Sequence, residues 1–547
     1  MRPQSAVKFN GHITSFFDLS RGVRQGCSLS PLLYVLYAEV LACTIRSNPS
    51  TTGLVIPGMA PLPVISQYAD DTSLVVTSDS SIEAVFESYS LFEKGSGSKL
   101  NLSKSKGLWL GRWSGRTDPP VVLLWSSVKL KVLGAFIGPG DLEEDNWRPR
   151  LTAIENTLNA WRARHLSYRG RALVINALGL SRIWYLASVI PVPDWVVREL
   201  NSLVFKFFWK GKVDLVARTV VVQPCCAGGF GVVSIQLKVY ALLVQWVRRF
   251  VVSSSGWALF FHLHCRACFG QSPWDVLSGP APFDPGGLPP FYRDLLLAWK
   301  AVDGAFSVAK AALVIGVSSG LVSARVSGVS TKSVYTYLLS EHRSDPHCVA
   351  KFARQYGPLY WPLTWDQLHW FDMDRPVIDL SWKVAHGVLY TAERLSSFGY
   401  AVPTDCFCGP AVESLEHLFF SCPLAQSVLS WLYSLMFRCS PLAPSPLCRH
   451  ALFGFNQDEL RCVPRVFVYM LNVSKYFLWL ARNDFRFRDV APSAVTVLEN
   501  VKVRVRFNLP LLFKRFRSPR RRRYFVRQWG ARRVVASVVD GRLVVSI

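Results

Sequence analysis

The sequence predicts a mixed fold, with an α/β region over about the first 140 residues followed by a longer, mainly helical region. In the first region, short runs of β-branched and aromatic residues alternate with segments of helical periodicity. From residue 146 onward, the spacing of apolar residues is helical. A chain of 547 residues is too long for a single core, so we expect roughly three to four domains.

Four segments define the α/β region. Residues 29–46 predict a helix, with Ser30 as its cap and Pro31 at the first helical position. The runs "VISQY" and "TSLVV" predict a hairpin that has Ala69, Asp70 and Asp71 at its turn. Residues 81–97 predict a helix ended by glycines, and residues 128–138 predict a further strand pair.

The helical region begins with an amphipathic segment. Its apolar face carries Leu151, Ile154, Leu158 and Trp161, and another face carries Arg162 and Arg164. Residues 271–291 are rich in Pro and Gly and predict a linker. The two longest apolar stretches, residues 173–192 and 306–324, are interrupted by Arg182 and Lys310. A membrane span needs about 20 apolar residues with few or no charges, so we expect buried helices and no stable membrane insertion.

Charge and cysteine content indicate the partner and the compartment. The chain has 62 Lys and Arg against 37 Asp and Glu, a net charge of +25. This excess favours a polyanionic partner, nucleic acid first and an anionic membrane surface second, over a merely basic soluble protein. The N-terminus lacks the layout of a signal peptide, and the 13 cysteines indicate reduced thiols in the cytoplasm or nucleus.

Two adjacent carboxylates, Asp70 and Asp71, are the first candidate site. Carboxylates at a hairpin turn can bind divalent cations, Mg²⁺ above all. Two metal ions about 4 Å apart can hold both the attacking and the leaving oxygen of a phosphoryl transfer. The alternative is an ordinary Asp-rich surface turn.

The order of motifs around this pair carries a family resemblance. Arg-Gln-Gly in "RGVRQG", then Ser-Pro-Leu opening a helix, "YADD", "NLSKS" and Leu-Gly follow one another within the first 134 residues. This order resembles the palm of a reverse transcriptase, most closely that of non-LTR (LINE-like) retrotransposon polyproteins. The resemblance implies RNA-directed DNA synthesis on an RNA template from a DNA primer, with two Mg²⁺ ions.

The resemblance also implies residue roles. Asp70 and Asp71 would bind the metal, Tyr68 would lie beside the primer end, and Lys104 would act on the leaving group. The residues expected to line the template and the incoming nucleotide are Gly22, Arg24, Gln25 and Gly26. Asn101 falls in the motif with Lys104, and Leu133-Gly134 resembles the primer-grip strand.

One departure from the family pattern concerns the first metal-binding aspartate, which the family carries on an earlier strand. Only twenty residues precede Arg21, and the single aspartate among them, Asp18, lies too close and in the wrong pattern. We therefore expect the C-terminal part of such a polyprotein, truncated at its N-terminus and inactive alone. The rivals are a non-catalytic nucleic-acid-binding relic and a membrane-surface protein.

The expected organisation follows from the resemblance. The parts are a partial palm (1–140), a thumb-like helical region (141–215), a helical connector (216–400), a zinc-knuckle-like module (401–425), C-terminal helices (426–500) and a basic tail (501–547).

A Cys/His cluster predicts the zinc site. Cys406, Cys408, His417 and Cys422 form a Cys₃His set, which suits tetrahedral Zn²⁺. The segment resembles the zinc-binding segment of the same family, with Glu413 and Glu416 as supporting or solvated charges. The Cys-x-Cys spacing departs from Cys-x₂-Cys, which leaves joint ligation by both cysteines open; a packed helix without metal is the alternative.

A second Cys/His cluster gives a different expectation. "FHLHCRACFG" contains His262, His264, Cys265 and Cys268 within seven residues. For this segment we favour an amphipathic helix with buried thiols.

The C-terminal tail combines cations with aromatic residues. Its candidate nucleic-acid contacts are Arg515, Arg517, Arg520, Arg521, Arg522, Arg523, Tyr524 and Trp529. Arginines can neutralise phosphates while aromatic rings stack on unpaired bases. The alternatives are a nuclear-localisation patch and a solvated run of charge.

Overall fold

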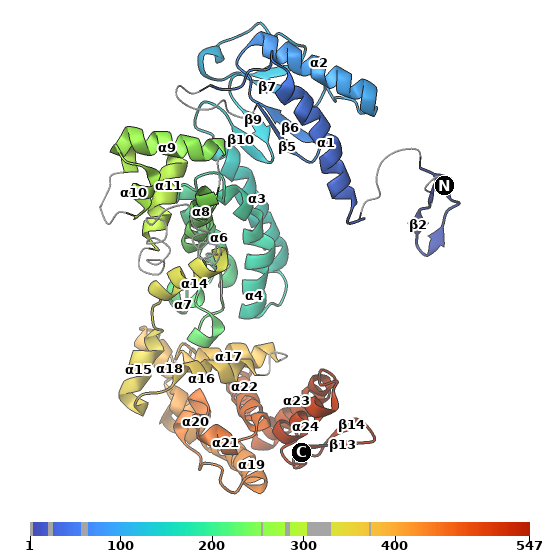
Figure 1. Cartoon of the computed structure of the whole chain (residues 1–547). Coiled ribbons are helices and arrows are strands. Elements are labelled where there is room, and N and C mark those ends of the chain that lie inside the picture. Colours follow the sequence, from blue (N-terminus) through green and yellow to red (C-terminus); the bar gives the residue numbers. More distant parts are fainter. Residues whose placement is uncertain are drawn as a thin grey trace. The chain divides into compact units, whose positions relative to one another are not determined.

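The computed structural model describes residues 4–19, 26–55, 64–252, 255–278, 285–302, 330–370 and 374–547 (Figure 1). The chain divides into two compact units. The first comprises Met1–Arg148 and Val252–Val276, and the second comprises Pro149–Val251 and Leu277–Ile547.

The first unit contains short strands and three long helices. Its elements are β1 (Gln4–Ser5), β2 (Lys8–Phe9), β3 (His12–Ile13), β4 (Phe17–Asp18), α1 (Ser30–Ser47), β5 (Ile65–Tyr68), β6 (Asp71–Leu74), α2 (Asp79–Ser96), β7 (Lys106–Leu108), the 3₁₀ turn Gly111–Trp113, β8 (Leu124–Ser126), β9 (Leu130–Val132), β10 (Ala135–Ile137) and α9 (Gly256–Phe269). The antiparallel pairs are β1–β4, β2–β3, β5–β6 and β9–β10, and β7–β8 is parallel. The predicted mixture of helices and strands is confirmed, but the described strands form pairs rather than one palm sheet.

The core of the first unit lies where α1 and α2 pack on β5. Its buried residues are Leu41, Ala42, Ile45, Ile65 and Val85. The helix predicted for residues 81–97 is confirmed as α2, and its glycine end is confirmed by Gly97 with φ +72°. The helix begins earlier than predicted, at Asp79, where the Ser78 side chain accepts from the Ser81 N–H.

The predicted Ser30 cap is wrong. Leu29 occupies the N-cap position of α1 with helical backbone angles, so Ser30 already lies within the first turn. Pro31 lies in that turn as expected.

The strand pair predicted at residues 128–138 is confirmed as β9–β10. Leu133 and Gly134 form its two-residue turn, with φ +46° and +86°. These left-handed angles suit Gly134 and place the Leu-Gly pair at the turn rather than within a strand.

The second unit is mainly helical. Up to residue 400 its elements are α3 (Glu143–Arg162, which begins in the first unit), α4 (Tyr168–Val174), the helical turns Ile175–Gly179 and Leu180–Arg182, α5 (Trp184–Ala187), α6 (Asp194–Phe208), α7 (Arg218–Val221), the turn Cys225–Ala227, α8 (Ile235–Val252), the end of α10 (Pro273–Ser278, which lies mostly in the first unit), the turn Pro285–Gly287, α11 (Pro290–Lys300), α14 (Thr331–Glu341), α15 (His347–Tyr356), α16 (Trp361–His369), α17 (Arg375–Ala385) and α18 (Ala392–Ser397).

The elements after residue 400 are β11 (Asp405–Cys406), β12 (Gly409–Val412), the π-helical turn η6 (His417–Ser421), α19 (Pro423–Cys439), α20 (Cys448–Phe453), α21 (Glu459–Cys462), α22 (Arg465–Arg488), α23 (Ala494–Phe513), α24 (Pro519–Gln528), β13 (Ala536–Val539) and β14 (Arg542–Val545). Helix α22 packs against α17, α19 and α23 and supplies much of this core.

Three helical predictions have mixed outcomes. The apolar face of α3 is confirmed, since Leu151, Ile154 and Leu158 are buried. Helix occupies part of the predicted linker, because α10 and the start of α11 fall within residues 271–291. Residues 173–192 form short helical segments, whereas the stretch 306–324 lies outside the described residues. In the described part of the chain, no helix has the length and hydropathy to cross a bilayer.

Candidate functional site

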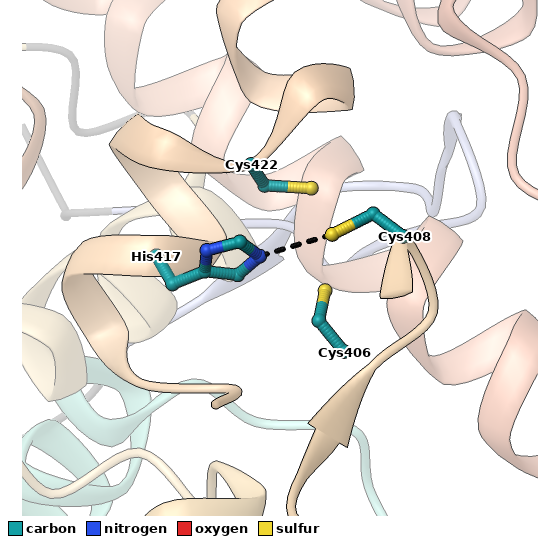
Figure 2. A group of neighbouring side chains, drawn as sticks. All are labelled: Cys406, Cys408, His417 and Cys422. Atoms are coloured by element: carbon teal, nitrogen blue, oxygen red, sulfur yellow. Dashed lines mark hydrogen bonds between the residues drawn. The ribbon is translucent and has the colours of Figure 1, made fainter. Parts of the chain in front are cut away.

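The four predicted zinc ligands converge in the second unit. Cys406 ends β11, Cys408 lies in the turn before β12, His417 begins η6, and Cys422 directly precedes α19. One potential ligand atom from each lies within 4.8 Å of the others, as Figure 2 shows. Cys408 Sγ lies 3.1 Å from His417 Nε2. Among the described residues, no other group of three or more His, Cys, Asp or Glu side chains is placed to hold a metal ion.

The unusual Cys-x-Cys spacing is accommodated by the hairpin turn. Cys406 pairs with Gly409 at the end of the hairpin, and Cys408 lies in the two-residue turn between them, where its Sγ lies 3.1 Å from His417 Nε2. Phe407 between them packs its ring against Phe485 of α22, with centroids 5.8 Å apart. Gly409, with φ +140°, turns the chain back into β12. Both cysteines therefore join the donor set.

The electrostatics of the cluster favour a thiolate at Cys422. The thiol of Cys406 donates to the Cys422 sulfur, and this hydrogen bond lowers the pKa of Cys422. Hydrogen bonds from the N–H groups of Leu424 and Ala425, at the start of α19, lower it further. The hydrogen bond to Cys422, with burial, raises the pKa of Cys406. Zinc binds the thiolate form of cysteine, so a Cys₃His set arranged in this way fits a structural zinc ion.

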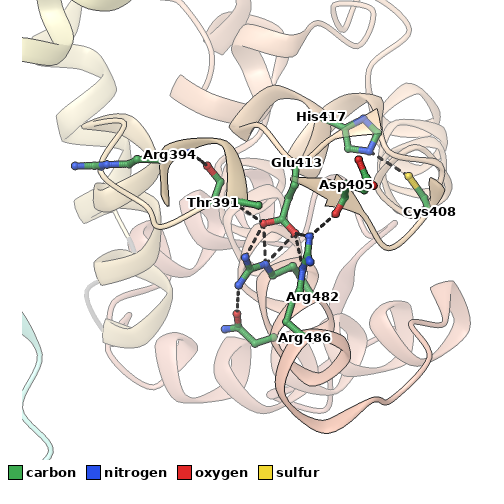
Figure 3. Close-up of polar contacts among 10 residues, drawn as sticks. Thr391, Arg394, Asp405, Cys408, Glu413, His417, Arg482 and Arg486 are labelled. Carbon is green, nitrogen blue, oxygen red and sulfur yellow. Dashed lines mark hydrogen bonds and ion pairs between the residues drawn. The ribbon is translucent and has the colours of Figure 1, made fainter. Parts of the chain in front are cut away.

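Glu413 connects the β11–β12 hairpin to α22, and the sequence did not indicate this contact. Its carboxylate is fully buried and accepts from Arg482 (2.6 Å), Arg486 (3.3 Å) and the Ala392 N–H (2.9 Å), as Figure 3 shows. Arg486 also donates to the Asp405 carbonyl, next to Cys406. Glu413 is therefore neither solvated nor part of the ligand set. Glu416 is half-buried and accepts from the Gln355 side chain.

The hairpin predicted around the aspartates is confirmed. Strands β5 and β6 pair from Ile65–Leu74 to Tyr68–Asp71, so Ala69 and Asp70 make the turn and Asp71 is the first residue of β6. Ala69 adopts φ +53° in this tight turn.

Both carboxylates at this turn are exposed, and Tyr68 is 70% exposed. Burial and the nearby charge of Asp70 raise the pKa of Tyr34 on α1. Among the described residues, no third His, Cys, Asp or Glu joins Asp70 and Asp71 in a metal-binding group. The pair supplies oxygen ligands that suit Mg²⁺ but forms only part of a two-metal site. Asp18, in β4, accepts from the Gln4 amide at 2.8 Å.

The remaining predicted palm residues have different placements. Gly22, Arg24 and Gln25 lie outside the described residues, and Gly26 is exposed with φ +84° before α1. Lys104 is exposed in a turn in which its N–H donates to the Asn101 carbonyl and side chain at 3.1 and 3.2 Å.

The second Cys/His cluster lies on α9. The predicted helix is confirmed, but only one of its two thiols is buried: Cys265 is inside, and Cys268 is exposed. His262 and His264 lie on the same helix.

The tail is folded, and its cations and aromatic rings are separated. The six arginines at positions 515, 517, 520, 521, 522 and 523 are exposed. Trp529 is only 2% exposed and packs in the core with Phe525 and Tyr469. The prediction that Trp529 stacks on bases is therefore wrong, because its ring is enclosed by protein. Tyr524 is half-buried, with the Arg465 and Arg527 guanidinium groups about 6 Å from its ring.

A substitution tests this reassignment. We expect Trp529→Phe to lower the free energy of unfolding by about 1 to 3 kcal/mol, because it removes buried contacts. The salt dependence of nucleic-acid binding should stay unchanged, since the exposed arginines remain. Thermal unfolding and fluorescence anisotropy measure the two quantities. A loss of oligonucleotide affinity at unchanged stability would restore the stacking role.

A buried thiol–imidazole pair also escaped sequence analysis. Cys348 Sγ lies 3.7 Å from His386 Nδ1, and His386 Nε2 lies 2.9 Å from the Gly228 carbonyl. Burial raises the pKa of Cys348 to about 12 and lowers that of His386 to about 4. Both groups are neutral at pH 7, so this pair is a structural contact rather than an activated nucleophile.

Comparison with known proteins gives matches over the two segments that contain these candidate sites. Residues 2–137 match the family model for reverse transcriptase (RNA-dependent DNA polymerase), and residues 330–429 match the model for zinc-binding in reverse transcriptase. The chain is 32% identical over 308 residues to the Transposon TX1 uncharacterized 149 kDa protein of Xenopus laevis. That alignment covers 54% of this chain and 23% of the relative, so the chain spans about a quarter of the relative's length. The chain therefore carries one segment that matches reverse transcriptases and another that matches the zinc-binding segment of reverse transcriptases, and more than half of it is similar to a transposon protein.

Proposed function

We propose that the β5–β6 hairpin is the metal-binding corner of an RNA-directed DNA polymerase that copies an RNA template from a DNA primer. The observation that carries the proposal is the exposed turn presenting Asp70 and Asp71 beside Tyr68, within the segment that matches reverse transcriptases. In this reaction the primer 3′-hydroxyl attacks the α-phosphate of a deoxynucleotide, and pyrophosphate leaves.

Each residue has a stated role in this proposal. Asp70 and Asp71 supply oxygen ligands for Mg²⁺, which neutralises phosphoryl charge when bound. Tyr68 contacts the primer end, and Lys104 faces the leaving group. Arg24, Gln25 and Gly26 position the template and the nucleotide.

The proposal includes a limit on the activity of these 547 residues alone. Among the described residues no third acidic side chain joins Asp70 and Asp71, and two carboxylates alone hold a metal pair poorly, so we infer that catalysis requires an additional carboxylate. A non-catalytic nucleic-acid-binding relic is the alternative.

The zinc cluster and the thiols complete the proposal. Cys406, Cys408, His417 and Cys422 would hold a structural zinc ion, which stabilises the segment without taking part in nucleotide transfer. None of the thirteen cysteines forms a disulfide, which is typical of proteins in a reducing compartment such as the nucleus or the cytoplasm.

Primer extension tests the proposal. We expect no synthesis from the 547-residue chain with an RNA template, a DNA primer, deoxynucleotides and Mg²⁺. A longer protein that includes an upstream acidic strand should extend the primer, and Asp70→Asn in that protein should reduce the rate by about 10²- to 10³-fold. Asp18→Asn is the matched control and should leave the rate unchanged.

Two outcomes contradict parts of the proposal. Robust synthesis by the 547-residue chain would show that the site needs no further carboxylate. An inactive longer protein that still binds nucleic acid would favour the non-catalytic relic.

A further inference from the structure

A serine at the start of α24 lies among the cations of the tail. Ser518 is exposed, has an extended backbone (φ −84°, ψ 151°) and directly precedes Pro519, the first residue of the helix. The next four residues, 520–523, are all arginine and all exposed. Arg515 and Arg517, on the other side of Ser518, are exposed as well. The hydroxyl is therefore open to solvent within a strongly positive surface.

The cations at the start of α24 are unfavourably placed for the helix itself. The N-terminal end of a helix dipole is positive, so anions stabilise the first turn and cations destabilise it. The first turn of α24 contains no acidic residue. Within the described ranges, no carboxylate pairs with Arg520, Arg521 or Arg523. A phosphate group at this position would offset both the dipole and the repulsion among the arginines.

The Ser518 hydroxyl already lies at the helix end. Its Oγ accepts from the Arg521 N–H at 3.3 Å, and the Ser518 carbonyl accepts from the Arg522 N–H at 2.9 Å. Pro519 has no N–H, so this turn has few hydrogen bonds to break when it opens in an enzyme's active site. When the turn closes again, a phosphate on the Oγ would lie beside the N–H groups of the first turn.

The residues after Ser518 distinguish it from the other Ser-Pro pairs. The chain has five such pairs, with serine at positions 30, 272, 440, 445 and 518. Only in the last pair is the proline followed by arginines. Ser445 is also exposed and outside the helices, but Leu447 and Cys448 follow its proline.

Such neighbours favour one class of enzyme. A protein kinase binds the residues around its target serine in an extended form. A pocket that offers no hydrogen-bond acceptor takes proline, which has no N–H, and acidic side chains beyond that pocket pair with the arginines. The sequence around Ser518 therefore fits a proline-directed kinase that also selects basic residues.

We propose that Ser518 is a phosphorylation site for a proline-directed protein kinase, and that its phosphate weakens the binding of nucleic acid by the tail. Ser518 Oγ attacks the γ-phosphorus of Mg²⁺-bound ATP, the bond from that phosphorus to the β–γ bridging oxygen breaks, and ADP leaves. The hydroxyl proton passes to a base of the kinase. The phosphate carries a charge of about −1.5 to −2 at pH 7, so it neutralises about two arginines. The effect on binding rests on the nucleic-acid partner proposed above, whereas the modification itself does not.

The first test measures the modification. The full chain is incubated with a purified cyclin-dependent kinase and Mg²⁺-ATP, and phosphopeptides are quantified by tandem mass spectrometry. We expect Ser518 to be phosphorylated about tenfold faster than the internal control Ser445, because a charge-assisted contact to the arginines contributes a factor of this size. Pro519→Ala keeps the hydroxyl and should lose the reaction at Ser518. Equal rates at the two serines, or a parental rate in Pro519→Ala, would overturn the proposal.

Hydrogen exchange tests the position of the phosphate without any nucleic acid. Phosphorylation of Ser518 should slow exchange at the Arg521 and Arg522 amides by about two- to fivefold, because the phosphate stabilises the first turn. Kinase-treated Ser445→Ala should show the same slowing, and kinase-treated Ser518→Ala should show none. Unchanged exchange in the phosphorylated parent would contradict a phosphate held at the helix end.

Oligonucleotide binding tests the consequence. Anisotropy is measured over a range of salt concentrations, and loss of two arginine contacts should reduce the slope of log K against log salt by about 1.4 for single strands. A parental slope in the phosphorylated protein would refute the effect on affinity. If the unphosphorylated parent binds no oligonucleotide, the nucleic-acid partner fails, and mass spectrometry and hydrogen exchange still decide whether Ser518 is the site.

Discussion

Cys408→Ser should remove zinc from the protein and open the segment around residues 401–425 to proteases. We expect the parent to carry one zinc ion per chain, held by the Cys₃His set that converges at the β11–β12 hairpin. In zinc-finger peptides at pH 7, structural zinc binds with an apparent free energy of about 10 to 16 kcal/mol, and this binding free energy stabilises the local fold. Metal content by plasma emission spectroscopy and limited proteolysis measure the two effects.

The matched control is Cys226→Ser, which changes an exposed thiol outside the cluster. It should keep one zinc ion and the parental protease pattern. Zinc should also dissociate as the pH falls, since the thiolates and the imidazole must be deprotonated to bind it. A parent that contains no zinc and shares its protease pattern with Cys408→Ser would favour a packed segment without metal.

Glu413→Ala should destabilise the C-terminal helices by about 3 to 5 kcal/mol. The substitution leaves Arg482 and Arg486 close together in a buried site without their carboxylate, and an unpaired buried charge carries a cost of this size. Zinc affinity should also fall by about 10- to 100-fold, as for partners that support metal ligands, because Arg486 holds the strand that ends in Cys406. Urea unfolding and a competitive zinc titration measure the two quantities.

Glu499→Ala is the control for this prediction. Glu499 forms an exposed ion pair with Lys502 on α23, so its loss should leave the unfolding midpoint and zinc affinity unchanged. If Glu413→Ala lowers the free energy of unfolding no more than Glu499→Ala does, the buried carboxylate contributes no net stability.

Local signals were sufficient to predict several parts of both sites. The β5–β6 hairpin follows from two β-branched runs around a short turn, and the C-terminal end of α2 follows from a glycine. The zinc ligands lie within seventeen residues of one another, so the cluster and its family resemblance indicated the site, although the Cys-x-Cys spacing left joint ligation open. In each case the residues that determine the structure are close in sequence.

Long-range packing explains most of what the sequence did not indicate. Glu413 meets Arg482 and Arg486, which lie 69 and 73 residues later, and no spacing rule connects them. The tail was misinterpreted at Trp529 because alternating cations and aromatic residues also form an amphipathic helix, with Arg outside and Phe and Trp inside.

The separation between Glu413 and its arginines has a consequence for biosynthesis. Arg482 leaves the ribosome 69 residues after Glu413, which takes about 3 to 14 s at ordinary elongation rates. During that interval the hairpin can gather its four metal ligands, but the carboxylate must stay hydrated, because burying it alone would cost too much. The nascent segment that contains the zinc ligands can therefore bind its ion before it packs against α22. That packing requires α22 to have left the ribosome.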